Sequence, residues 1–448
     1  MSFAKYPAYK DSGVAWLGRV PGHWEVKRLR HVAALNPSKS EIAEFPRDTE
    51  VSFLPMEAVG DDGTLNLDRT RPIAEVESGY TYFREGDVTI AKITPCFENG
   101  KGAVMRGLHN GHGFGTTELI VARPSESTTT SDYLHRLFTS RSFRMLGEAA
   151  MYGAGGQKRV PDDFVRDFAV AFPPLSEQTA IATFLDHETA RIDALVAEQE
   201  RLIALLQEKR QAVISHAVTK GLNPNAPMKD SGVEWLGEMP GHWEVRRIRD
   251  LSSFLTSGPR GWSERISEEG AKFIQSGDLT DELSIAFDEA KRVAVNDDAE
   301  AARTKLADGD VVVCITGAKT GNVALCGVVP EDAYVNQHLC LIRPRPDILP
   351  DLLAIYLKSD AGQRHFAVAQ YGLKQGMSLE NIKETPVLVP PIHEQRQIVE
   401  IARSTSVSIG ALITEARTAI TLLQERRTAL VSAAVTGQID VRGWAKAA

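Results

Sequence analysis

The sequence Pro173-Pro174-Leu175-Ser176-Glu177-Gln178 opens the segment that decides the fold of this chain. After it, neither proline nor glycine occurs until Gly221. Proline fits before or inside the first turn of a helix, and glycine followed by proline is typical of a helix end. We therefore expect one helix of about 43 residues, roughly 65 Å long at 1.5 Å per residue.

Apolar residues recur along this segment in steps of three, four and seven, the seam spacing of a coiled coil. A helix of this length needs a partner helix to stabilise it. The predicted seam residues are Ile181, Leu185, Ile192, Leu195, Leu202, Leu206, Val213 and Ala217.

The same chain supplies the partner, because residues 389–439 repeat residues 172–222. The second opening is Pro390-Pro391-Ile392-His393-Glu394-Gln395. Small residues in its first half, and Gly410 in its middle, favour either close approach of another surface or a looser helix. Its predicted seam residues are Ile398, Ala402, Ile409, Leu412, Ala419, Leu423, Leu430 and Ala434.

A second, tryptophan-rich block also occurs twice. Residues 10–26 contain Lys-Asp-Ser-Gly-Val, Trp-Leu-Gly and Pro-Gly-His-Trp-Glu-Val, and residues 229–245 repeat all three. His23 and His242 are candidates for catalysis or metal binding, but neither has a second ligand at metal spacing. We favour a packed turn that docks on the coiled coil, and we expect the first block to lie near residues 430–439.

Composition limits the function classes. The chain has 448 residues, of which 25% are charged and 43% hydrophobic, and a formal net charge of −8. The length allows about two to four domains of soluble, globular composition. The negative charge argues against general coating of nucleic acid but leaves room for local basic clefts. Residues 135–160 show such a bias, with Arg136, Arg141, Arg144, Lys158 and Arg159 against Glu148.

Cysteine usage and hydropathy indicate a cytoplasmic protein. Cys96, Cys314, Cys326 and Cys340 form no Cys-x-x-Cys pair, so reduced thiols are expected and a zinc site is not. No apolar run approaches the ~20 residues of a membrane span, and residues 1–5 lack the apolar core of a signal peptide.

Two divergent regions lie between the short blocks and the long helices. Each has a strand after a Gly-Asp turn (Gly86-Asp87 and Gly309-Asp310), a strand that ends in Arg-Pro, a helix and a glycine-rich loop. We expect a mixed α/β domain in each region. The fold class is therefore α+β, with two such domains joined by two long antiparallel coiled-coil helices and an internal duplication with pseudo-two-fold symmetry.

Catalytic motifs are missing from the sequence. Residues 317–321 lack the spacing of a phosphate-binding loop, and residues 153–156 are not flanked by a dinucleotide-binding unit. Asn36-Pro37-Ser38 lacks the aromatic grip of an amino-methyltransferase, and a Gly-Asp turn explains Asp87 better than a nuclease site with Lys92 does. We expect no catalytic residue and no metal site.

The glycine-rich loops, residues 152–159 and 371–376, are candidates for DNA contact. Glycine lets backbone approach a groove, and Gln, Lys and Arg contact base edges and phosphates, although a single such loop is more often a solvated turn. Two loops at corresponding places favour DNA. The candidate DNA-binding residues are Lys92, Asn99, Lys101, Thr116, Thr117, Tyr152, Gln157, Lys158, Arg159, Arg260, Trp262, Lys319, Asn322, Gln337, His338, Tyr371, Lys374 and Gln375.

Together with residues 184–193 (Phe-Leu-Asp-His-Glu-Thr-Ala-Arg-Ile-Asp) and 205–222, these motifs resemble the specificity subunit of type I restriction-modification enzymes, the HsdS family. The resemblance covers essentially the whole chain and departs at Ile401 to Ile409. It implies two target recognition domains that each bind one half of a split double-stranded DNA target. Two methyltransferase subunits would dock on the helices and restriction subunits would join through the complex, without a membrane. S-adenosylmethionine, ATP and Mg would belong to those partners, and this chain would hold no cofactor.

The corresponding domains follow the repeats. Residues 1–172, with the block 9–32, would form the first recognition domain, and 173–222 the first spacer helix. Residues 223–389, with the block 228–251, would form the second domain, 390–440 the second spacer helix, and 441–448 a tail. Two other hypotheses stay open: a scaffold whose variable domains bind proteins, and a self-contained DNA methyltransferase or endonuclease, which the missing motifs disfavour.

Overall fold

The computed structural model describes residues 3–153, 156–370 and 376–444. The chain divides into two compact units, and the divisions fall inside the long helices. Unit 1 contains Met1–Gln199 and Thr418–Ala448, and unit 2 contains Glu200–Arg417. Each unit therefore combines one α/β domain with parts of both helices.

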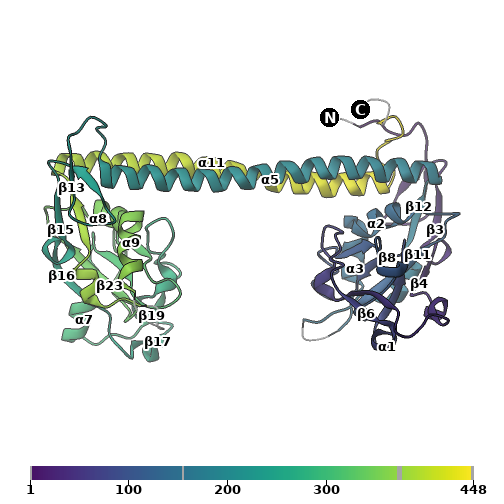
Figure 1. Ribbon diagram of the computed structural model, residues 1–448, viewed down its shortest axis with the longest axis horizontal. Helices are drawn as coiled ribbons and strands as arrows, with labels where there is room; N and C mark the ends of the chain where they lie inside the picture. Colours follow the sequence, from purple (N-terminus) through teal and green to yellow (C-terminus); the bar gives the residue numbers. More distant parts are fainter. Residues whose placement is uncertain (1–2, 154–155, 371–375, 445–448) are drawn as a thin grey trace. The chain divides into compact units, whose positions relative to one another are not determined.

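The α/β domain of unit 1 has a central sheet that is covered on both faces. One face, with Val88, Ile90 and Ile120, packs against helices α2 (Ser131–Thr139) and α3 (Arg141–Ala149), which separate it from helix α5 (Figure 1). The alternate residues of the same strands face a second sheet. The central sheet has the order β4 (Ala33–Leu35), β11 (Leu119–Pro124), β8 (Val88–Ala91), β9 (Gly102–Val104). The second has the order β6 (Thr70–Pro72), β5 (Glu50–Leu54), β10 (His112–Gly115), β7 (Thr81–Arg84).

Unit 2 repeats this plan with different side chains. Its central sheet has β16 (Ser252–Ser257), β23 (Leu339–Pro344), β20 (Val311–Cys314) and β21 (Val323–Leu325) in the same spatial order. Helices α8 (Pro350–Lys358) and α9 (Asp360–Ala369) cover one face. The other face packs on β17 (Ile266–Ser267), β19 (Lys291–Val293), β18 (Ala271–Ile274) and β22 (Ala333–Val335). The predicted fold class, including the duplication, is confirmed.

Shorter elements complete both units. Ribbons β1–β2 and β13–β14 belong to the tryptophan-rich blocks, and ribbons β3–β12 and β15–β24 lead into the long helices. Their bounds are β1 (Tyr9–Asp11), β2 (Arg19–Pro21), β3 (Glu25–Arg28), β12 (Ala169–Phe172), β13 (Met228–Asp230), β14 (Glu238–Pro240), β15 (Glu244–Arg247) and β24 (Pro386–Val389). The shorter α-helices of the described residues are α1 (Ile73–Val76), α4 (Asp162–Asp167), α6 (Ile248–Leu251), α7 (Ala299–Thr304) and α10 (Leu379–Lys383).

A buried ion pair joins the two motifs that the sequence repeats on the central strands. In unit 1 the Arg123 guanidinium donates to both oxygens of Asp87, at 2.7 and 2.8 Å. In unit 2 Arg343 donates to both oxygens of Asp310, at 2.8 Å each. Both aspartates are almost fully buried, so this bidentate pair offsets the desolvation of a carboxylate beneath the sheet edge. The Gly-Asp and Arg-Pro motifs are therefore structural partners.

The long helices pair antiparallel within unit 1. Helix α5 (Leu175–Lys220) begins beside the end of helix α11 (Ile392–Val435), since the Tyr133 hydroxyl donates to the carbonyls of both Ala171 and Val435. Further along α5, Asp193 accepts from Arg427 at 3.0 Å. In unit 2 the end of α5, at Ala217 and Val218, shares a core with the start of α11.

The predicted seam is right at the helix ends and at Ile409, and it is wrong at three positions in between. Leu195, Leu202 and Leu412 are 44%, 43% and 47% exposed, whereas Ile413 and Ala416 are buried. The reason is that 3.6 residues per turn drift against a strict seven-residue repeat, so the inner face moves to neighbouring positions.

Helix α11 also has an 18-residue window that is apolar enough to span a membrane by length and composition alone. The expectation that no stretch approaches a span is therefore wrong on composition. Only 17% of that window is buried, so much of its apolar surface is free for other contacts.

The Glu-Gln pair in the first turn of each long helix bonds both the tryptophan-rich block and the α/β domain. Glu177 accepts hydrogen bonds from the Tyr6 hydroxyl (2.6 Å) and the Trp24 indole (2.9 Å), and its other oxygen lies 2.7 Å from His23 Nε2. The adjacent Gln178 amide bonds the backbone carbonyl of Thr128 and the backbone N–H of Thr130 in the α/β domain. The first helical turn thus holds the tryptophan-rich block with one side chain and the domain with the next.

Unit 2 uses the same pair. Glu394 accepts from the Trp243 indole at 3.0 Å and lies 2.6 Å from His242 Nε2. Burial alone would raise the pKa of Glu394, but the bonds from Trp243 and His242 outweigh it and lower that pKa. Gln395 bonds the backbone of Asp347 and Leu349. Among the described residues no group of three or more His, Cys, Asp or Glu could hold a metal, and both histidines belong to these docked turns.

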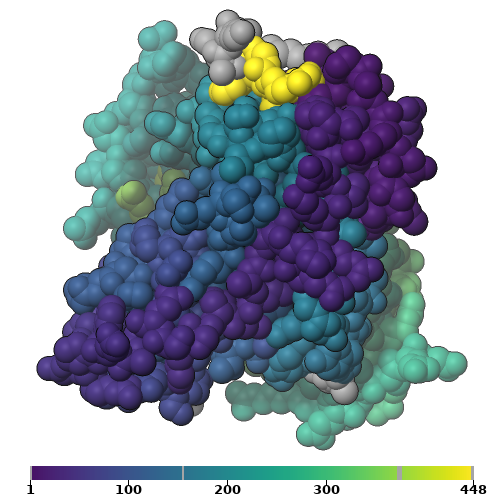
Figure 2. Space-filling view, turned by 90° about the vertical axis from the view of Figure 1, so that its right-hand side faces the viewer, coloured from purple at the N-terminus to yellow at the C-terminus, as the bar shows by residue number. Residues whose placement is uncertain are grey.

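The two ends of the chain meet in unit 1, as the repeat order predicts. The Tyr9 hydroxyl donates to the carbonyl of Gly437 at 3.1 Å, and the Asp440 amide donates to the carbonyl of Ala4 at 2.8 Å. Figure 2 shows the C-terminal residues packed between N-terminal residues and α5. Gly437 also lies directly against Trp24, which confirms the predicted contact of the first block with residues 430–439.

Two glycine-to-alanine variants test this closure. Gly437 has φ +73°, and an added Cβ would lie 2.4 Å from Pro21 Cδ, so Gly437→Ala should lower the midpoint of thermal unfolding. Gly410 lies inside α11 with nothing within 4 Å of an added Cβ, so Gly410→Ala should stabilise by roughly 0.5–1 kcal/mol. If both variants shifted the midpoint of thermal unfolding equally, Gly437 would not be required for the contact with Pro21 and Trp24.

Candidate nucleic-acid interface

In unit 1 three loops meet at one end of the central sheet. Strand β8 ends at Ala91, and the next residue, Lys92, donates its amide to the carbonyl of Glu118 at 2.8 Å. The Val160 amide donates to the carbonyl of Lys92 at 2.9 Å, and the Thr94 amide to that of Lys158 at 3.0 Å. The predicted DNA-contact residues of unit 1, which were far apart in sequence, therefore lie in one cluster of loops.

An ion pair fixes the glycine-rich loop in this cluster. The Arg159 guanidinium donates to both carboxylate oxygens of Glu118, at 2.7 and 2.9 Å. The bond from Arg159 lowers the pKa of Glu118, although partial burial opposes it. Arg159 is thus paired within the chain, while its neighbours Gln157 and Lys158 are exposed.

Unit 2 builds the same junction from other residues. The Ile315 amide donates to the carbonyl of His338, and the Met377 amide donates to the carbonyl of Ile315, at 2.8 Å each. His338 therefore occupies the place of Glu118. Its Nδ1 bonds the Thr316 hydroxyl and its Nε2 lies 3.1 Å from the Gln337 amide. A carboxylate in one unit corresponds to an imidazole in the other.

The predicted site residues differ in how far they reach solvent. Those that are exposed are Asn99, Thr117, Tyr152, Gln157, Lys158, Arg260 and Lys319. Those that are half-buried are Lys92, Lys101, Thr116, Arg159, Asn322, Gln337 and His338. Three of them also brace neighbouring loops, since Lys101, Lys319 and Asn322 donate to the carbonyls of Met56, Gly277 and Leu279.

One predicted contact is wrong and three are not described. Trp262 is only 1% exposed, lies in a core with Phe273 and Tyr334, and donates its indole N–H to Glu300 at 3.0 Å. It has no surface to offer to DNA. Tyr371, Lys374 and Gln375 lie outside the described residues.

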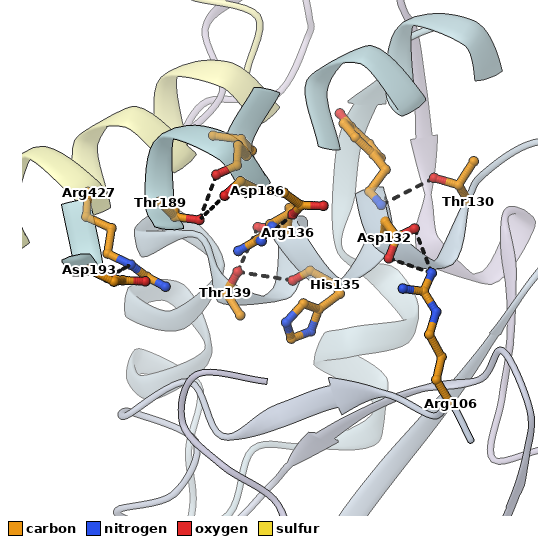
Figure 3. Close-up of polar contacts among 12 residues, drawn as sticks. Arg106, Thr130, Asp132, His135, Arg136, Thr139, Asp186, Thr189, Asp193 and Arg427 are labelled. Atoms are coloured by element: carbon orange, nitrogen blue, oxygen red, sulfur yellow. Dashed lines mark hydrogen bonds and ion pairs between the residues drawn. The ribbon is translucent and has the colours of Figure 1, made fainter. Parts of the chain in front are cut away.

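Part of the basic bias of residues 135–160 is also used internally. Arg136 pairs with Asp186 of α5 (Figure 3). His135 is buried below α5, and burial lowers its pKa to about 4, so it is neutral at pH 7. Arg136 therefore attaches α2 to the long helix, whereas the His135 ring lies against the loop at Gly63.

Comparison with known proteins places the chain. Residues 240–407 match the family model described as "Type I restriction modification DNA specificity domain". The EcoAI specificity subunit of Escherichia coli is 41% identical over 188 residues, covering 42% of this chain and 31% of that protein. The Escherichia coli EcoEI specificity subunit is 24% identical over 470 residues, covering 85% of this chain and 77% of that protein.

Solved structures share the fold. One is a chain of a type I R-M system whose complex assembly and conformational transition were described. It matches with a TM-score of 0.75 and 17% identity, over 93% of this chain and 98% of that chain. The HsdS subunit from Thermoanaerobacter tengcongensis matches with a TM-score of 0.58 and 18% identity over 94% and 98%. The chain is thus similar to type I restriction-modification specificity subunits, and residues 240–407 match their DNA specificity domain.

Within these loop junctions, sequence reasoning missed Glu118 and Thr316. A signal was present, because Thr116-Thr117-Glu118 and Asn336-Gln337-His338 each precede the strand that ends in Arg-Pro. Aligning the regions on that strand would have paired Glu118 with His338. Their polar partners come from distant loops, which the alignment does not reveal.

The loop ion pair gives a prediction for Arg159→Gln. Losing the charge-assisted bonds to Glu118 should loosen the glycine-rich loop, so amide hydrogen exchange should accelerate at residues 92–94 and 156–160. Arg166→Gln is the matched control, because Arg166 makes an exposed pair with Asp163 on α4. Unchanged exchange at the loop in Arg159→Gln would show that the ion pair does not hold it.

Proposed function

We propose that this chain is the non-catalytic DNA-recognition subunit of a type I restriction-modification complex, and that each α/β domain recognises one half of a bipartite double-stranded target. One observation carries the proposal. Each unit has the same three-loop junction at the end of its own central sheet, and the side chains of the junction differ between the two units. A common sheet and junction with different loop side chains is what we expect of two domains that recognise two different DNA sequences.

The exposed side chains of the junctions have the chemistry of DNA contact. Gln157 and Lys158 extend from a glycine-rich loop in unit 1, and Lys319 is exposed in unit 2. Amide groups pair with adenine edges, and lysine binds guanine or phosphate. The net charge of −8 restricts such contact to local surfaces.

The long helices support docking of two methyltransferase subunits. On α5, Leu202 and Leu205 are 43% and 53% exposed, and on α11, Val407 and Leu422 are 73% and 59% exposed. These exposed apolar side chains are the candidate contacts for the docked subunits. Those partners would supply S-adenosylmethionine, Mg and, with the restriction subunits, ATP, in the cytoplasm and without a membrane.

Methylome sequencing of cells that carry this subunit with its methyltransferase partner tests the proposal. We expect one split motif, methylated in both halves, that disappears when the gene for this chain is deleted. The purified chain alone should show no methylation, cleavage or ATP hydrolysis. An unsplit motif, or robust turnover by the isolated chain through further purification, would overturn the proposal.

Loop substitutions should affect one half of the target. Replacing Gln157 and Lys158 by alanine should weaken discrimination in one half-site only, by about 1–3 kcal/mol for each base whose hydrogen-bond partner is removed. Replacing Lys374 and Gln375 should affect the other half. The measurement is binding of the methyltransferase complex to duplexes with single base changes. Equal weakening on target and random DNA would reduce these residues to phosphate contacts.

An insertion tests whether the helices set the gap between half-sites. Four residues added near Leu195 would lengthen α5 by about 6 Å, with a rotation of roughly 40° beyond them. That rise equals nearly two base pairs at about 3.4 Å each. Active variants should methylate the same half-sites across a longer gap. An unchanged gap, or altered half-site bases, would show that the helices are not the spacer.

A further inference from the structure

Arg144 of α3 holds the β8–β9 loop in unit 1. Its Nη1 donates to the carbonyl of Glu98 at 2.9 Å, and its side chain lies so close to Gly100 that an added Cβ there would be 3.3 Å from Arg144 Cδ. The held loop continues to the glycine-rich loop, since Thr94 donates its hydroxyl to the Glu98 carboxylate at 2.9 Å and its amide to the carbonyl of Lys158.

Unit 2 holds the corresponding loop with a neutral side chain. Gln363, on α9, occupies the place of Arg144, one turn after a serine that begins the helix in both units. Its amide donates to the carbonyls of Gly321 and Leu357, at 2.9 and 2.8 Å. Gly321 corresponds to Gly100, and an added Cβ there would meet Gln363 Oε1 at 3.1 Å. A glutamine is therefore sufficient for this structural task.

The charge of Arg144 lacks a partner in the described part of the chain. Its half-buried guanidinium has no carboxylate oxygen within 4.0 Å there, and Nε is buried without an acceptor. Burial, followed by the nearby charge of Arg427, lowers the pKa of Arg144. A half-buried cation without a counter-ion is costly, and the duplicate unit shows that the fold does not require it.

We propose that Arg144 binds a DNA backbone phosphate beside the half-site of unit 1, and that unit 2 lacks this contact at Gln363. The inference rests on the proposed function. A phosphate supplies the missing anion, and the Arg144 guanidinium keeps N–H donors for it beside the one that bonds Glu98. Arg144 is linked to the Lys158 loop through Glu98 and Thr94, and it would add a sequence-independent contact to one half of the complex only.

The test uses the complex of this chain with its methyltransferase partner, two duplexes and a salt series. One duplex carries the motif found by methylome sequencing, and the other is scrambled. Arg144→Gln should weaken binding to both duplexes about tenfold, because a charge-assisted bond is removed. The slope of log affinity against log salt should fall by about 0.9, which corresponds to one phosphate. Arg144→Lys should keep the slope.

Arg106→Gln is the matched control. It removes one positive charge from the same unit, but Arg106 pairs with Asp132 on the exposed surface beyond the opposite end of β9 (Figure 3). Its salt slope should equal that of the wild type. Thermal unfolding of Arg144→Gln should also match the wild type, since glutamine serves in unit 2.

Unchanged affinity and slope in Arg144→Gln would refute the phosphate contact while leaving the proposed function intact. A lower unfolding midpoint with the same slope would assign Arg144 a structural role and also refute it. If Arg144→Gln does not fold, a reduced slope in Arg144→Lys overturns the proposal, and a retained slope with weaker binding supports it. A wild-type complex with no preference for the methylated motif would overturn the proposed function as well.

Discussion

The hydrogen bonds of one dipeptide, Glu-Gln in the first turn of each long helix, are the contacts on which the rest of the structure depends. Glu177 accepts the Tyr6 and Trp24 donors, and Gln178 bonds the domain backbone through its amide. The Tyr6, Trp24, Glu177 and Gln178 side chains are all buried, where an unpaired donor costs about 1–3 kcal/mol. The helix start, the tryptophan-rich block and the α/β domain are thus held in one orientation by two adjacent side chains.

This arrangement explains why the repeated motifs lie at the junction between each long helix and its α/β domain. The identical motifs are the ones that form the junction between helix and domain, including Gly221 and Gly437, each packed against a tryptophan. The divergent parts are the outer sheets and loops. Because the junction and the Asp–Arg pair fix the central sheet, loop residues can change between the units without disturbing it.

The duplication also separates structural from functional roles. Where corresponding residues of the two units hold the same loop, the neutral one shows what the fold requires. Gln363 holds its loop without a charge, so the fold does not require the charge of Arg144. Glu118 and His338 are a second example, since both close the same junction with different chemistry. Such differences are where the two units are expected to differ in the DNA they bind.

The sequence by itself determined the order of elements, the two long helices, the meeting of the chain ends and the family resemblance. These follow from local patterns: proline and glycine at helix ends, apolar spacing, and the two repeated blocks. It also placed most candidate residues on loops that the fold does bring together. It misplaced Trp262, Leu195, Leu202 and Leu412, because burial depends on which neighbour covers a side chain and not on its type.

Only the tertiary structure decided which polar groups have partners. Arg159 and Arg136 are committed to Glu118 and Asp186, whereas Arg144 of the same basic stretch has no counter-ion in the described chain. In the sequence these three arginines look alike. They differ because a charge is satisfied or left unpaired by groups from distant strands and helices, and that proximity exists only once the chain has folded.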